Sequence, residues 1–235
     1  MSVSPSTSPS VSPSVSPSAS PSTSMSASQS ASASAATTPT YDSTSSQKHS
    51  SSATYLEWSH VLGGGSNRIV IITIAMRVVT ATSVTFNGVN CTFLTQQKPG
   101  GDVNSELWYI LEADLPAAGT YTVRVNGSSS QQWVAGAISY SDVSSLGTPN
   151  GANGSGTAAS VTIVSEVDDV VVDCCSLQSA NATLAPHTSQ VERWDKATSV
   201  GRGGGSTETA TTTSTVMSWS HNSDIWAITG VALKT

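Results

Sequence analysis

A strict repeat fills the N-terminal segment. Every even-numbered position from Ser2 to Ser34 is serine, and proline recurs at every fourth residue; the prolines are Pro5, Pro9, Pro13, Pro17 and Pro21. Proline fixes its own φ and pushes the preceding residue out of the helical region, so the repeat favours an extended chain. In an extended chain the serines share one face, and Val, Thr, Ala and Pro share the other. The missing proline N–H groups restrict such a strand to edge pairing.

The segment lacks what a packed core requires. No charged residue precedes Asp42, the first 52 residues contain 23 serines, and the few apolar side chains are small. Their burial cannot offset the entropy lost on ordering the chain. We therefore expect an extended tail or linker over residues 1–52 and a single folded domain over residues 53–235. Two roles stay open for the tail: a strand laid against another subunit, or a free, stiff linker that carries O-linked sugars.

The charge and hydropathy of the folded part exclude several partners. Residues 53–235 carry 14 acidic and 8 basic side chains, and the basic residues lie singly. Nucleic-acid binding requires clustered Lys and Arg, so we expect no nucleic-acid partner. The longest apolar run, Ile69–Met76, is far shorter than the ~20 residues of a membrane-spanning helix, and no membrane span is expected. The N-terminus has neither the basic segment nor the apolar stretch of a signal peptide, which leaves action at the site of synthesis, release by lysis, or export by a route without a recognisable signal.

Short runs rich in Val, Ile, Thr, Tyr and Trp, separated by Gly, Asn, Asp, Ser and Pro, predict an all-β domain. Asn87-Gly88 is typical of the two-residue turn of a hairpin. The pattern indicates an antiparallel two-sheet β-sandwich, and a jelly roll is the expected topology. The expected strands are 54–61, 67–76, 82–87, 89–96, 105–112, 119–126, 132–141, 158–165, 169–178, 188–194, 212–220 and 224–233.

Residues that could carry catalysis do not form a recognisable motif. His60, His187 and His221 could each meet a serine and an aspartate in an unknown fold, but no nucleophile-elbow motif accompanies them. The acidic cluster of Asp168, Asp169 and Asp173 could bind Ca²⁺, although a strand-flanking turn explains it better. We expect no catalytic residue, no metal and no cofactor.

Glycine and cysteine patterns have plain structural explanations. The glycine triplets 63–65 and 203–205 lack the lysine and the helix of a phosphate-binding loop, and flexible loops are expected there. The cysteines are Cys91, Cys174 and Cys175, an odd number without metal-site spacing, and burial as small apolar side chains is expected. The adjacent Cys174 and Cys175 should alternate in a strand, one toward the core and one outward.

Six tryptophans could offer a sugar-stacking surface. Five lie in apolar strand contexts and are expected in the core, whereas Trp194, in a charged context, is the expected exposed residue and the candidate glycan contact. Trp58-Ser59-His60 also resembles Trp219-Ser220-His221. Either the first and last hairpins are structurally equivalent, or the similarity is convergent strand chemistry.

Several strand patterns together resemble a known class of module; they are Trp58-Ser59-His60, residues 63–72, 84–88, 106–109 and 135–140, and the closing run 226–233. They are similar to β-sandwich modules in structural proteins of tailed bacteriophages and in some bacterial surface proteins. The Ser-Pro-Ser repeat ahead of the module also resembles repeats in phage virion proteins. This resemblance covers nearly all of residues 54–233 and brings no catalytic residues with it.

Three functions follow as hypotheses. The first is a non-enzymatic virion component, such as a capsid decoration, head-fibre or tail-associated protein, whose tail docks on copies of itself or on other structural subunits. The second is an extracellular or cell-surface fibril subunit with an O-glycosylated tail that threads between protomers. The third is a carbohydrate-binding module that contacts glycans through Trp194. The absence of signal-peptide features favours the first, with the virion as the expected location.

Overall fold

A computed structural model describes residues 3, 37–77, 79–180 and 183–235. Within this part of the chain every extended pair of strands is antiparallel and no α-helix occurs, which confirms the predicted all-β, two-sheet architecture. The first sheet consists of β1 (Thr40–Leu62), β2 (Ile69–Met76), β3 (Ala81–Phe86), β4 (Val89–Asn90), β5 (Thr92–Gln97), β6 (Asn104–Leu111) and β7 (Gly119–Ser141). The second sheet consists of β8 (Ser145–Leu146), β9 (Asn150–Val164), β10 (Val170–Leu177), β11 (Leu184–Pro186), β12 (Val191–Ala197), β13 (Arg202–Thr209) and β14 (Ser214–Lys234). A 3₁₀ turn, η1 (Glu112–Asp114), follows β6.

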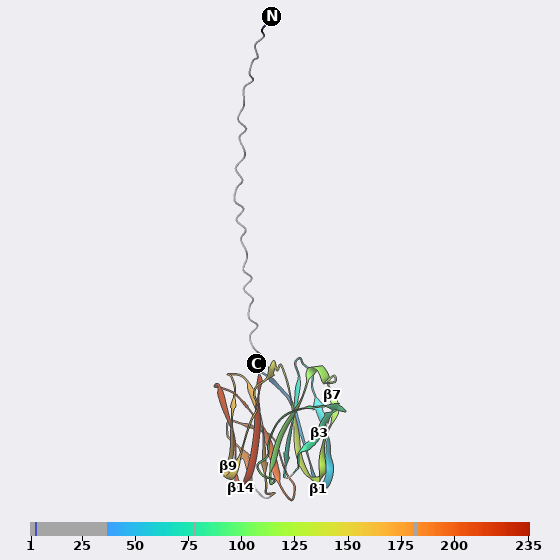
Figure 1. Ribbon diagram of the computed structural model, residues 1–235, viewed down its shortest axis with the longest axis vertical. Helices are drawn as coiled ribbons and strands as arrows, with labels where there is room; N and C mark the ends of the chain where they lie inside the picture. The colour runs from blue at the N-terminus through green and yellow to red at the C-terminus, as the bar shows by residue number, and fades with distance from the viewer. Residues whose placement is uncertain (1–2, 4–36, 78, 181–182) are drawn as a thin grey trace. The chain divides into compact units, whose positions relative to one another are not determined.

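Each sheet folds over a core of its own, and a third core lies between the sheets. One apolar cluster draws only on the first sheet and its loops, another only on the second, and the third on both. The long pairs β1–β7 and β9–β14 bend at register shifts, which lets each sheet close over its own cluster. Figure 1 shows β9 and β14 on one side of the folded part, and β1, β3 and β7 on the other.

The central strands explain why the longest apolar runs are buried on both faces. In β2, Ile72 and Ile74 enter the core of the first sheet, while Ile71 packs between the sheets. In β10, Cys174 lies between the sheets and Cys175 in the core of the second sheet. Alternation along a strand therefore sends neighbouring side chains into two different cores. The cysteines are free and buried as expected, but the expectation that one of the adjacent pair faces outward is wrong.

The two sheets repeat one strand arrangement. The first has the order β4-β3-β7-β2-β6-β5 with β1 on β7, and the second has the order β11-β14-β10-β13-β12 with β9 on β14. Apart from the two-residue strands β4 and β8, the orders correspond strand by strand. The registers agree as well, because Ile69 faces Leu111 and Tyr140, while Val170 faces Thr209 and Leu233.

An irregularity strengthens this correspondence. A β-bulge interrupts the edge strand β5 between Phe93 and Thr95, and a bulge interrupts β12 between Glu192 and Trp194. Each bulge occupies the same position relative to the neighbouring strand, β6 or β13. The domain is therefore an internal repeat of a six-stranded unit, with one unit in each half of the chain.

This topology corrects two finer expectations. Each sheet is built from one continuous half of the chain, whereas a jelly roll passes the chain back and forth between its sheets, so the arrangement is not a jelly roll. Trp58 and Trp219 are both buried, but they lie on β1 and β14, which are not equivalent strands. The resemblance of their flanking sequences is therefore convergent strand chemistry.

Strand boundaries differ from the predicted ones in physically informative ways. β1 begins at Thr40, so the folded part starts before the boundary expected at residue 53, because the serine-rich stretch over 40–52 pairs with the second half of β7. Residues 119–126 and 132–141, expected as two strands, form the single bent strand β7, and β14 likewise joins 212–220 to 224–233.

The glycine triplet 203–205 was expected in a flexible loop, but it lies in the strand β13. The packing of these glycines explains why. A Cβ on Gly203 would lie 2.1 Å from the Ala75 Cβ, and a Cβ on Gly205 would lie 2.3 Å from Nε1 of Trp194. These glycines are therefore required by close packing inside a sheet. The triplet 63–65, in contrast, lies in the loop between β1 and β2, as expected.

Candidate functional site

The predicted assembly tail lies outside the described residues, with Ser2, Pro5, Pro9, Pro13, Pro17, Pro21 and Ser34 among the residues that the structure does not describe. What the structure shows is the point where this segment joins the domain. Thr37 and Thr38 are exposed, Pro39 is buried, and β1 begins at the next residue.

A cluster of four side chains, which we call the Arg193 clamp, holds the start of β1. Tyr41 of β1 and Tyr140 of β7 meet edge to face, with ring centroids 5.6 Å apart. The Arg193 guanidinium of β12 lies 3.8 Å from the centre of the Tyr41 ring. Its Nε donates to Oγ1 of Thr207 on β13 at 2.8 Å, and its Nη2 to the Tyr140 hydroxyl at 3.4 Å. The clamp therefore joins the first strand of one sheet to two strands of the other.

The clamp borders a shallow groove of about 420 Å³, lined by Pro39, Tyr41, Tyr140, Val191, Arg193 and Glu208 among others. Burial raises the pKa of the Tyr140 phenol, so this side chain stays a neutral hydrogen-bonding group at physiological pH. A cation over an aromatic ring contributes ~0.5–1 kcal/mol at an exposed site. The groove therefore lies beside Pro39 and Tyr41, where β1 begins.

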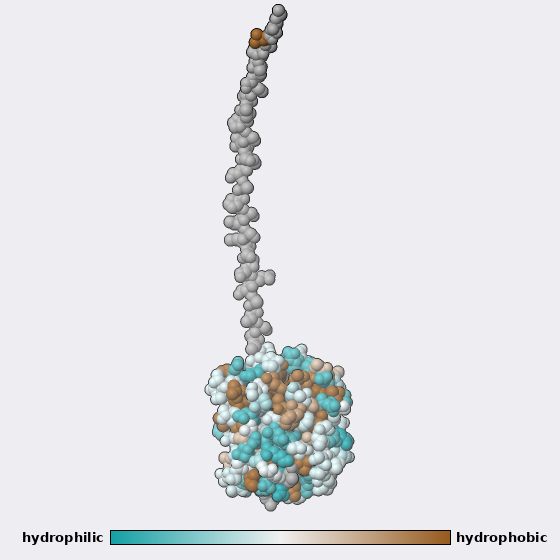
Figure 2. Space-filling view, in the orientation of Figure 1, coloured by the Kyte–Doolittle hydropathy of each residue, from teal (hydrophilic) through white to brown (hydrophobic). Residues whose placement is uncertain are grey.

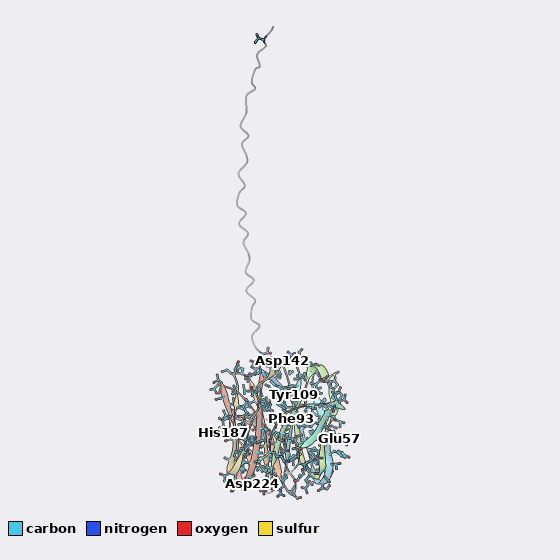
Figure 3. The ribbon with its side chains drawn as sticks, in the orientation of Figure 1. Glu57, Phe93, Tyr109, Asp142, His187 and Asp224 are labelled. Carbon is cyan, nitrogen blue, oxygen red and sulfur yellow. The ribbon has the colours of Figure 1, made fainter. Side chains whose placement is uncertain are left out.

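The internal repeat places a second groove at the equivalent position of the other half. It has a volume of about 360 Å³ and is lined by Tyr109, Leu111, Val143 and Leu146, beside the ion pair of Arg68 and Glu112. Tyr109 and Leu111 hold the positions on β6 that Thr207 and Thr209 hold on β13. Figure 2 shows apolar side chains on the upper part of the visible face, where Figure 3 labels Tyr109 and Phe93.

The Arg68–Glu112 pair fixes the rim of this second groove. Nη2 of Arg68 lies 2.6 Å from Oε1 of Glu112, and Nε of Arg68 lies 2.7 Å from Oε2. This two-pronged contact lowers the pKa of the Glu112 carboxyl and raises the pKa of the Arg68 guanidinium. The segment Val143–Leu146, which leads into β9, packs here much as Pro39 and Tyr41 pack in the first groove.

The candidate glycan contact Trp194 is not on the surface. It is 4% exposed, lies between the two sheets, and donates from Nε1 to Oγ1 of Thr73 at 3.0 Å. A Cβ on Gly136 of β7 or on Gly205 of β13 would each lie 2.3 Å from this nitrogen, so the indole fills a slot made by two glycines. The expectation that Trp194 is exposed is wrong, because the bulge in β12 turns this side chain inward although its neighbours are charged.

The three histidines considered for catalysis have serine or backbone partners. His60 is fully buried among Ser43, Ser45 and Ser139, and burial lowers its pKa to about 4. The Ser139 hydroxyl also contacts the Asp42 carboxylate at 2.7 Å, so the serine lies between the carboxylate and the imidazole.

The other two histidines, His187 and His221, are also not placed to activate a serine. His187, labelled on the β9 side in Figure 3, contacts Ser189, which donates to Glu208 at 2.9 Å. Nδ1 of His221 lies 2.7 Å from the backbone carbonyl of Asn222. Activation of a serine requires an imidazole between the serine and a carboxylate. At His187 the serine lies between the imidazole and the carboxylate, and at His221 the imidazole contacts a backbone carbonyl.

Two buried carboxyl groups are held by tryptophan N–H groups. Asp173 in β10 is fully buried, accepts from Nε1 of Trp219 at 2.7 Å and from Ser206, and burial raises its pKa to about 7. In the first sheet, burial raises the pKa of Glu106, which accepts from Nε1 of Trp108 at 2.9 Å. Each carboxyl group therefore forms hydrogen bonds inside its own sheet.

The acidic cluster considered for Ca²⁺ is spread over separate contacts. Asp169 is buried and accepts from Lys234 Nζ at 2.8 Å and from the Glu166 N–H at 2.6 Å, whereas Asp173 lies inside the second sheet. Within the residues that the structure describes, no three His, Cys, Asp or Glu side chains are grouped to hold a metal ion. In the same residues, no helix is long and apolar enough to span a membrane.

No family model matches the chain, and neither a curated protein nor a solved structure matches it. The candidate site therefore rests on geometry alone. Sequence reasoning missed the Arg193 clamp because it assigned Tyr41 to the tail. The onset of charged and aromatic residues at Tyr41 and Asp42 was a signal that could have moved the boundary.

Proposed function

We propose that the protein is a non-enzymatic structural component of a virion, such as a capsid decoration, head-fibre or tail-associated protein, which uses its N-terminal segment for assembly or anchoring. The observation that carries the proposal is the Arg193 clamp. A tether can transmit load only if its root is fixed to the body that it anchors. Here the root is the 23-residue strand β1, which pairs with β7 along its length and is held at Tyr41 by the second sheet.

The remaining polar clusters support a structural role. The contacts of His60, Asp173 and Glu106 tie neighbouring strands together, and each of these side chains is buried. A substrate would have to displace core packing to reach them.

An extracellular fibril subunit with an O-glycosylated tail is the second candidate, because the same anchored root would serve it. The third hypothesis, a carbohydrate-binding module, relied on glycan contact through Trp194, and this side chain is buried. We therefore keep the fibril subunit as the alternative.

Particle composition tests the virion proposal. Particles purified on a density gradient from the producing culture should contain this chain in a fixed ratio to the major capsid protein, as measured by quantitative mass spectrometry. Its absence from the particles would overturn the proposal. Intact-mass measurement separates the alternative, because added hexose masses on the N-terminal segment would favour the fibril subunit.

A further inference from the structure

We propose that the outer edge of β9, residues Ala158–Val164, receives the N-terminal Ser-Pro segment of a second copy of this chain as an added antiparallel strand. The inference rests on the proposed assembly role of that segment and names the surface that binds it.

As a β-strand, the donor segment would have one complete hydrogen-bonding edge and one incomplete edge. In a β-strand, the N–H and C=O groups of alternate residues point to opposite sides, as their side chains point to opposite faces. All the even positions from Ser2 to Ser34 are serine, and every proline up to Pro21 is at an odd position. The serine edge keeps all its N–H donors, whereas the opposite edge lacks one at each proline. Such a strand can be added to a sheet, and it then blocks further pairing at its other edge.

The acceptor is a strand with one paired side. Within the described residues, β9 pairs with β14 from Asn150 to Val164 and with no other strand. The carbonyl of Thr162 accepts a hydrogen bond from the exposed side chain of Asn150 at 3.0 Å, which shows that even-numbered residues of β9 direct their backbone groups away from β14. Between Ala158 and Val164 the register with β14 is continuous. No other strand of the described residues pairs with this edge, and an incoming strand would replace the Asn150 side chain at the Thr162 carbonyl.

The other edges are protected from strand addition. β4 has only two residues, and β11 has three and contains Pro186. β5 and β12 are interrupted by bulges. The outer half of β1 carries Glu57, which pairs with Arg124 at 3.1 Å. These features discourage edge pairing, whereas no charged residue occurs between Asp142 and Glu166, the stretch that contains β9.

The side-chain faces agree in the antiparallel orientation. In an antiparallel pair, hydrogen-bonded residues lie opposite each other with their side chains on the same face. The serines of the donor would then lie beside Ser160 and Thr162, which are exposed, and cross-strand pairing of hydroxyl side chains is favourable. The odd-numbered Val, Ala and Pro residues would lie on the face of Val161 and Ile163, which are buried. A parallel orientation would reverse these faces, so the sequence and the structure together select the antiparallel one.

The role of the N-terminal segment is tested by adding prolines to one or the other of its two strand edges in the full chain. One variant replaces Ser4, Ser8, Ser12, Ser16, Ser20, Ser24, Ser28 and Ser32 by Pro. Its matched control replaces Val3, Thr7, Val11, Val15, Ala19, Thr23, Ala27 and Ala31 by Pro, which adds the same number of prolines to the edge that already lacks donors. Sedimentation velocity over a concentration series measures self-association of the purified proteins. The first variant should raise the dissociation constant by at least about tenfold, and the control should change it by less than about twofold.

Equal effects of the two variants, or a wild-type chain that stays monomeric at all concentrations, would overturn the proposal. This assay uses purified protein, so its result is independent of whether the chain is found in particles. Failure of the docking and failure of the virion role can therefore be told apart.

The acceptor half is tested with Ser160→Pro and the matched control Ser59→Pro. Both serines are exposed and point their backbone groups outward, since the Val61 carbonyl of β1 accepts from Ser43 as the Thr162 carbonyl accepts from Asn150. Only the β9 variant should weaken self-association.

Hydrogen exchange of the wild-type chain gives a second readout that does not depend on folding of a variant. The amides of Ser160, Thr162 and Val164 should gain protection as protein concentration rises. Protection that is independent of concentration would show docking within one chain or none, and either result overturns the second-copy assignment.

Discussion

A single methyl group added to Gly205 tests the packing that joins the two sheets. A Cβ at this position would lie 2.3 Å from Nε1 of Trp194, well inside van der Waals contact. The indole cannot move away, because Gly136 of the opposite sheet makes room for it at the same distance, and its N–H is bonded to Thr73. Gly205→Ala must therefore displace a buried tryptophan or separate the sheets.

The cost follows from two contributions. Overpacking of a well-filled core costs ~1–3 kcal/mol, and a disrupted buried hydrogen bond adds ~1 kcal/mol. We expect Gly205→Ala to lower the free energy of unfolding by ~2–4 kcal/mol, which corresponds to a fall in Tm of roughly 4–16 °C for a domain of this size. Urea unfolding of the full chain, followed by circular dichroism, measures the change.

A second Gly-Gly-Gly-Ser sequence in the chain provides the control. Gly64 belongs to the other Gly-Gly-Gly-Ser sequence, and a Cβ there would meet no atom within 4 Å. Gly64→Ala should change the free energy of unfolding by less than ~0.5 kcal/mol. If the two variants were equally stable, the assignment of Gly205 to a tight slot around Trp194 would be refuted.

Three further predictions concern buried and clamping side chains. Because the pKa of folded Asp173 is raised to about 7, its contribution to stability is complete below pH ~4 and is lost as pH rises through 7, with a slope of up to ~1.4 kcal/mol per pH unit. Asp173→Asn should flatten this part of the pH dependence of the free energy of unfolding, measured by urea unfolding. An unchanged slope would contradict the burial of the carboxyl. Trp194→Ala should lower the free energy of unfolding by ~3–5 kcal/mol, and a surface-like change below ~0.5 kcal/mol would show that the side chain is exposed. Arg193→Ala should speed hydrogen exchange at the start of β1, whereas Arg124→Ala, which removes a similar contact with Tyr55, should leave exchange at Tyr41 unchanged; equal exchange at Tyr41 in the two variants would count against the clamp.

The sequence predicted the fold class because alternation and turn residues are local signals. The Asn87-Gly88 turn, the apolar run of β2 and the strand β10 were all found from the chain alone. The correspondence between the two sheets was not found, because equivalent positions carry different side chains; Glu106 of β6, for example, matches Gly204 of β13. Equivalence is visible only in register and bulge position.

The errors share one physical cause, which is that tertiary packing overrides local composition. The glycines of β13 indicate a loop until Trp194 is known to pack against them. The charged neighbours of Trp194 indicate exposure until the bulge in β12 turns the indole inward. The serines of residues 40–52 indicate a tail until β7 provides a strand for them to pair with. In each case the deciding partner is distant in sequence.

A density map of the assembled protein, determined by electron cryomicroscopy, would locate the N-terminal segment relative to the neighbouring copies. We expect residues within 2–34 to form an extended strand along Ala158–Val164 of a neighbouring copy, with the serines on the solvent face. A map in which the assembled copies are well ordered, but in which this segment contacts only its own domain or follows no neighbouring strand, would contradict the claim that it is the assembly element.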